Sequence, residues 1–101
     1  MTTEKTDKLR EELGAAIGPV IWGDLRKHLA RDVIIIVAPE TPLLEAAMAI
    51  AENNQEKVTL WIKDGVLTKP NTHQLGHWEK NFDIPFLSVV VQPFILIQVL
   101  N

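Results

Sequence analysis

The sequence feature that most constrains the fold is an apolar run over residues 86–100. A helix that spans a membrane needs about 20 apolar residues. This run is shorter, and it is interrupted by Ser88, Gln92 and Pro93. It is rich in β-branched residues, which favours a buried strand, or two strands with a bend at Pro93. The rest of the chain must therefore cover both faces of this segment.

Residues 33–37 are the natural partner of the apolar run. All five are valine or isoleucine, and a β-branched stretch without polar alternation predicts a strand that is buried on both faces. We expect residues 33–37 and 86–98 to form a small antiparallel sheet. An apolar strand left at a sheet edge would promote aggregation. The sequence therefore also predicts a homodimer in which two copies share the sheet through the C-terminal strand.

The Gln92-Pro93 pair is the main polar interruption within the C-terminal run. Proline lacks an N–H group, so within a sheet it belongs at an edge or a bulge. A glutamine buried in such surroundings must form hydrogen bonds, or it destabilises the fold by about 1–3 kcal/mol. Two interpretations remain open. Pro93 marks a bulge with Gln92 bonded to neighbouring backbone, or it marks a bend that sends residues 94–100 to a second copy.

Apolar spacing and capping signals predict five helices around the sheet. Asn71 and Gln74, for example, have the spacing of a capping box. The fourth helix is expected to turn its four apolar residues, within 58–62, towards the core. The predicted helices cover residues 6–17, 19–29, 42–51, 54–64 and 71–81. We therefore predict an α+β fold, with the helices packed on one face of the small sheet and a single domain over residues 1–101.

Composition narrows the class of protein. The 101 residues carry a net charge of −3, with acidic and basic residues interleaved, and they contain no cysteine. Disulfides and thiolate metal sites are therefore excluded, and the absence of cysteine fits a reducing cytoplasm. A chain without a basic patch is not expected to bind nucleic acid. The polar start of the sequence lacks the apolar core of a signal peptide, so we expect a cytoplasmic protein without a membrane segment.

Three tryptophans, one in each of three predicted helices, suggest anchors in a shared core. His28 is expected near the end of the second helix, where a positive ring would interact favourably with the helix dipole. The spacing of His73 and His77 would place two imidazoles on one helix face, as in some metal sites. No further ligand cluster supports such a site, so we predict no metal. The candidate pocket or interface residues are Trp22, His28, Trp61, His77, Trp78, Gln92, Pro93 and Phe94.

No pattern in the sequence predicts catalysis. Ser88 is the only serine, it lies in a predicted strand, and the five glycines form no phosphate-binding cluster. We therefore expect no catalytic residue and no cofactor. The leading hypothesis is a non-catalytic protein-interaction or regulatory module. The first alternative is a protein or enzyme that binds a small ligand in a pocket lined by tryptophan and histidine. The second is a helix-turn-helix-like DNA-binding protein, in which residues 42–64 supply the helix pair.

Several motifs, taken together, resemble a small bacterial family, the domain of unknown function family 2288. The resemblance extends over nearly the whole chain, and it implies short, compact, uncharacterised proteins without a known activity, cofactor or catalytic residue. Acidic residues are usual in that family where this chain has Asn53 and Asn54, which argues against a carboxylate site there. The motifs are Trp22…Leu25…His28, Arg31-Asp32, Ala49-Ile50-Ala51, Trp61-Ile62, Lys69-Pro70, Gln74-Leu75…Trp78 and Val91-Gln92-Pro93-Phe94…Leu96-Ile97-Gln98.

Overall fold

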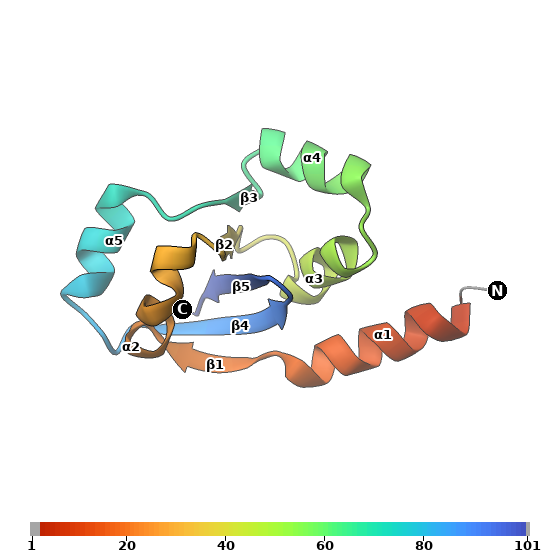
Figure 1. The fold of residues 1–101 in the computed structure, drawn as a ribbon, viewed down its shortest axis with the longest axis horizontal. Coiled ribbons are helices and arrows are strands. Elements are labelled where there is room, and N and C mark those ends of the chain that lie inside the picture. Colours follow the sequence, from red (N-terminus) through yellow and green to blue (C-terminus); the bar gives the residue numbers. More distant parts are fainter. Residues whose placement is uncertain (1–2, 101) are drawn as a thin grey trace.

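The computed structural model describes residues 3–100, which form one five-stranded sheet with helices around it (Figure 1). The strands are β1 (Gly18–Ile21), β2 (Ile34–Val37), β3 (Leu67–Thr68), β4 (Pro85–Val91) and β5 (Phe94–Val99). They lie in the order β1-β4-β5-β2-β3. The helices are α1 (Thr3–Ala16), α2 (Trp22–Leu25), α3 (Leu43–Ala51), α4 (Gln55–Lys63) and α5 (Thr72–Glu79), and a 3₁₀ helix, η1 (Arg26–Arg31), follows α2. The predicted α+β class is confirmed.

The sheet is mostly antiparallel, but its two most apolar strands are parallel. β2 pairs with β5 in parallel, with Ile34 opposite Ile95 and Ile36 opposite Ile97. The expected antiparallel sheet is thus confirmed for most of its strand pairs, and the pair between β2 and β5 is the exception. A parallel pair needs a long crossover connection, and the chain supplies one, because α3, α4, β3, α5 and β4 all lie between β2 and β5.

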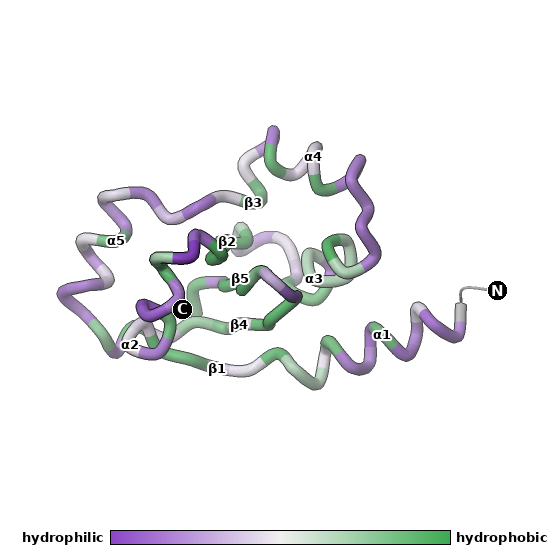
Figure 2. The backbone as a smooth tube through the Cα atoms, viewed as in Figure 1, coloured by the Kyte–Doolittle hydropathy of each residue, from purple (hydrophilic) through white to green (hydrophobic). Residues whose placement is uncertain are grey.

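Helices cover both faces of the sheet, and not one face as the sequence analysis predicted. On one face, α2 and α5 pack against Ile34, Ile95 and Ile97. On the other face, α3 packs against Val89 and Leu96, and α1 and α4 add half-buried side chains at its margin. Successive strand residues point to opposite faces, so the uninterrupted apolar strands place side chains in the hydrophobic core on each face. The hydrophobic residues are accordingly concentrated in the central strands and α3 (Figure 2).

The segment predicted as a helix over residues 19–29 begins as a strand. Gly18–Ile21 forms β1 at one edge of the sheet, where Pro19 lies opposite Leu87 of β4. An edge strand is the place where a sheet tolerates proline, because the missing N–H group can face away from the ladder. The helical part of the segment starts only at Trp22. Here the tertiary pairing with β4 outweighs the helical spacing of the apolar residues.

The Gln92-Pro93 pair forms the turn between β4 and β5, which are paired from Phe86–Val99 at one end to Val91–Phe94 at the other. Gln92 is exposed at this turn, so its expected burial is wrong. β5 is paired on both sides within its own chain, and it is therefore not the unpaired edge on which the predicted homodimer was based. The dimer itself stays a prediction.

Capping residues position the two helices that flank the β3 edge of the sheet. The predicted capping box of α5 is confirmed, with Asn71 Oδ1 accepting from Gln74 N–H at 2.8 Å and Gln74 Oε1 accepting from Asn71 N–H at 2.9 Å. At the start of α4, Asn54 Oδ1 accepts from Lys57 N–H. Gly65, with φ of +78°, follows α4 and turns the chain towards β3.

Candidate functional site

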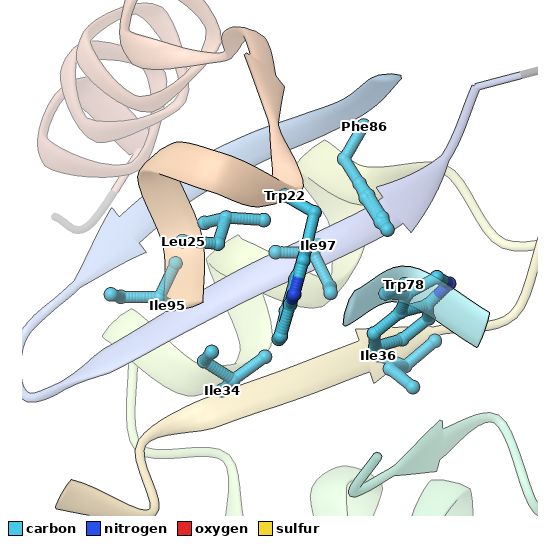
Figure 3. Close-up of a cluster of buried hydrophobic side chains, with 8 residues drawn as sticks. All are labelled: Trp22, Leu25, Ile34, Ile36, Trp78, Phe86, Ile95 and Ile97. Carbon is cyan, nitrogen blue, oxygen red and sulfur yellow. The ribbon is translucent and has the colours of Figure 1, made fainter. Parts of the chain in front are cut away.

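Two of the three tryptophans lie together in the core and not in a pocket. The ring centroids of Trp22 and Trp78 are 5.0 Å apart, and that of Phe86 lies 5.1 Å from Trp78. Trp22 and Phe86 are fully buried, and Trp78 is 4% exposed. Figure 3 shows the three rings above the isoleucines of β2 and β5. This cluster holds α2 and α5 on the sheet.

The carboxylate of Glu79 closes this aromatic cluster on its solvent side. It accepts hydrogen bonds from Trp22 Nε1 and from Arg26, with Arg26 Nη2 at 2.7 Å from Oε1 and Arg26 Nε at 3.1 Å from Oε2. The Arg26 guanidinium also lies 4.9 Å from the centroid of the Phe82 ring. The bond from Arg26, followed by that from Trp22, holds the pKa of Glu79 at about 2. Glu79 therefore joins α5 to α2.

Loss of the Glu79 charge is expected to loosen the fold in acid. Because the pKa of Glu79 is about 2 in the folded protein and about 4.3 in an unfolded chain, the unfolded state binds more protons between these values. The ionised Glu79 carboxylate therefore stabilises the fold above pH 4.3, and this contribution is lost as the pH falls towards 2. We expect Glu79→Gln to flatten the fall in melting temperature over this range, measured by circular dichroism. The control Glu56→Gln removes an equal charge from the exposed surface of α4, and an equal flattening there would contradict a specific role for Glu79.

The histidines do not form a metal centre. His28 lies in the last turn of η1, where Arg31 contacts its Nδ1 atom. Burial lowers the pKa of His28, and the charges of Arg31 and Lys27 lower it further, so this site disfavours the positive ring that we expected at this helix end. His73 and His77 are exposed on α5. Among the described residues, no group of three or more histidine, aspartate or glutamate side chains could hold a metal ion.

A groove lies between α4 and the sheet, with a volume of about 880 Å³. It is bounded by β2, the end of α3, α4, β3 and the turn between β4 and β5. The apolar residues of its lining, called the floor below, come from elements that are far apart in the sequence. The floor residues are Ile35, Ile50, Val58, Ile62, Leu67 and Phe94.

The rim of the groove is polar but carries little charge. Four of its side chains are carboxamides, two are threonine hydroxyls, and the only titratable group in the lining is Lys69. The Lys69 ammonium is 2.5 Å from Asp32 Oδ2, so its charge is paired. The rim residues are Asn53, Asn54, Gln55, Thr59, Thr68, Lys69 and Gln92. The groove can thus bind an apolar group and form neutral hydrogen bonds at its edge.

Comparison with known families matches residues 8–99 to the family described as "Protein of unknown function (DUF2288)". The chain belongs to this family. Its predicted resemblance to family 2288 is thereby confirmed. The NMR solution structure of PA1075 from Pseudomonas aeruginosa is similar to this chain at 29% identity and a TM-score of 0.79, over 100% of this chain and 93% of that one. The curated proteins contain no match. Within residues 3–100, no helix is long and apolar enough to cross a membrane.

The groove of this family 2288 member contains two of the eight candidate residues. Gln92 and Phe94 line it, Pro93 is exposed between them, and Trp61 is half-buried against the core beside it. The other four, Trp22, His28, His77 and Trp78, do not line the groove.

Sequence reasoning missed most of the groove floor, because it placed those side chains in the core. The fourth helix was expected to bury all four of its apolar residues. Leu60 and Ile62 are instead 54% and 60% exposed. A signal was present in the sequence, because four apolar side chains within residues 58–62 span more than one helix face.

Proposed function

We propose that this protein is a non-catalytic binding module and that it acts through the groove between α4 and the sheet. The observation that carries the proposal is the lining of the groove, which combines an apolar floor with a polar rim whose one charged group, Lys69, is paired with Asp32. Ligand sites are typically concave and mostly apolar, with a small number of polar groups. General acid-base catalysis needs a titratable side chain at the reacting atoms, and Lys69, the only such group in the lining, is paired with Asp32.

The position of α4 supports this proposal. α4 has no buried residue, yet it presents Val58 and Ile62, one turn apart, to the groove. A surface helix usually turns its apolar stripe to the core. An exposed apolar side chain of this size at a concave site is explained if an occupant covers it. Binding of a regulatory partner or ligand there would be the output of the module, which we place in the cytoplasm of a bacterium.

The proposal is tested by the binding of N-phenylnaphthylamine, an uncharged dye whose fluorescence rises in apolar surroundings. We expect the wild-type protein to bind the dye and Ile62→Gln to raise its dissociation constant about fourfold. The expected loss corresponds to about one methylene group, or 0.8 kcal/mol, on a scale where 1.4 kcal/mol is tenfold. Fluorescence titration of the purified full chain measures both constants.

Leu60→Gln is the matched control for this experiment. Leu60 lies on the same helix with a similar exposure, 54% against 60% for Ile62, but it does not line the groove. Glutamine is a good helix former, so α4 should persist in both variants. Equal effects of the two substitutions, or no effect of Ile62→Gln, would contradict the proposal.

Light scattering of the same samples also tests the predicted homodimer. A measured mass of one chain, 11.4 kDa, would exclude the dimer.

A further inference from the structure

We propose that the occupant of the groove is a small, uncharged, apolar molecule that carries a carbonyl or hydroxyl group. This inference rests on the proposed function, because it names the ligand class for the same groove. Three properties of the groove lead to it: the charge of the lining, the chemistry of the rim, and the place of the exposed apolar side chains.

The charge of the lining favours a neutral ligand over a charged one. A charged group that leaves water without a partner loses a large hydration energy. The lining contains no carboxylate that could pair with a cation. An anion would have to compete for Lys69 with Asp32, whose Oδ2 atom lies 2.5 Å and whose backbone oxygen lies 3.4 Å from the ammonium. A neutral molecule does not incur this cost.

The rim supplies neutral donors and acceptors. Carboxamides both donate and accept hydrogen bonds. Asn54 uses its oxygen to cap α4, and the side chains of Asn53, Gln55 and Gln92 form no hydrogen bond to another residue within 3–100. These side chains are exposed, and a carbonyl or hydroxyl group on the ligand can replace water as their hydrogen-bond partner.

The distribution of exposed apolar residues favours a small molecule over a protein. A stable protein interface buries about 800 Å² on each partner and has an apolar core. Seven large hydrophobic residues are exposed within residues 3–100, and of these only Ile62 lines the groove. A single exposed side chain does not supply the apolar core that such an interface needs. Its volume of about 880 Å³ is within the range of about 300–1,000 Å³ that is usual for small-molecule sites.

The experiment compares two dyes that share one skeleton. N-phenylnaphthylamine is uncharged, and anilinonaphthalene sulfonate adds a sulfonate to the same two ring systems. We expect the wild-type protein to bind the uncharged dye at least tenfold more tightly, with the Ile62→Gln variant weakened and the Leu60→Gln variant unchanged. Fluorescence titration at several ionic strengths gives the dissociation constants.

A gain-of-binding variant makes the test independent of any loss of stability. Gln92→Lys places a cation on the exposed turn at the rim, and we expect it to raise the affinity for the sulfonate dye at least fivefold more than the affinity for the uncharged dye. Glu56→Gln changes the net charge by the same amount but does not line the groove. It should change neither constant by more than twofold.

The outcomes separate the two proposals. If both dyes bind through Ile62 with equal affinity, or the sulfonate binds more tightly, the inference of an uncharged ligand is overturned and the binding groove stands. If neither dye depends on Ile62, both proposals are overturned. If the affinity for the uncharged dye falls as the protein concentration rises, a second copy covers the groove, which overturns the small-molecule inference alone.

Discussion

Replacement of Trp22 by alanine is expected to lower the free energy of unfolding by about 3–5 kcal/mol, the usual range for a buried aromatic residue. Trp22 is fully buried, and it contacts elements on both sides of the aromatic cluster, Trp78 of α5 and Phe86 of β4. The substitution also removes the hydrogen bond that the indole N–H of Trp22 donates to the Glu79 carboxylate. A protein of this length is stable by only about 5–15 kcal/mol, so much of the total would be lost.

Urea denaturation followed by circular dichroism measures this loss, and Trp61→Ala is the control. Trp61 is only half-buried and lies outside the aromatic cluster, with Lys57 Nζ 4.9 Å from its ring centroid. Its substitution should cost less than half as much. If Trp61→Ala were the more destabilising change, the main aromatic anchor would lie on the α4 side of the sheet. The assignment of Trp22 and Trp78 to the principal aromatic core would then be wrong.

The strands and helix ends that local chemistry specifies were predictable from the sequence. Five β-branched residues at 33–37 and the apolar run at 86–98 became central strands, because no other segment could bury such side chains on both faces. The capping box of Asn71 and Gln74 marked the start of α5, because both of its hydrogen bonds form within four residues and do not depend on the rest of the fold. Pairing direction was not predictable, because it depends on the route of the chain between the strands.

The groove was not predictable because no single segment contains it. Ile35 and Ile50 read individually as core positions, and only the fold leaves them half-buried at a margin that α4 covers incompletely. Gln92 was singled out on the assumption that it would be buried. The structure places it at an exposed turn on the groove rim. A polar interruption in an apolar run thus marked the right place for the wrong physical reason.

Replacement of Leu96 by alanine is expected to cost about 2–5 kcal/mol, nearly as much as the loss of Trp22 but in the other core. Leu96 is fully buried on β5, where it lies opposite Ile35 and Val89 and belongs to the cluster that α3 covers. Deletion of its methyl groups leaves a cavity in the middle of the sheet, which neighbouring strands cannot close without breaking their pairing. Urea denaturation again measures the change.

Leu100→Ala makes the same chemical change four residues later, where the side chain is 40% exposed and lies beyond the end of β5. We expect it to cost less than about 1 kcal/mol, because this side chain lies at the surface and a large part of it already contacts water. If β5 is a central strand, Leu96→Ala must lower the stability much more than Leu100→Ala does. If the two variants lost similar amounts of stability, the C-terminal segment would be a loosely held edge that is available for exchange between two copies. If only Leu96→Ala is strongly destabilising, exchange would require both pairings of β5 to break, and the groove would remain the surface available for binding.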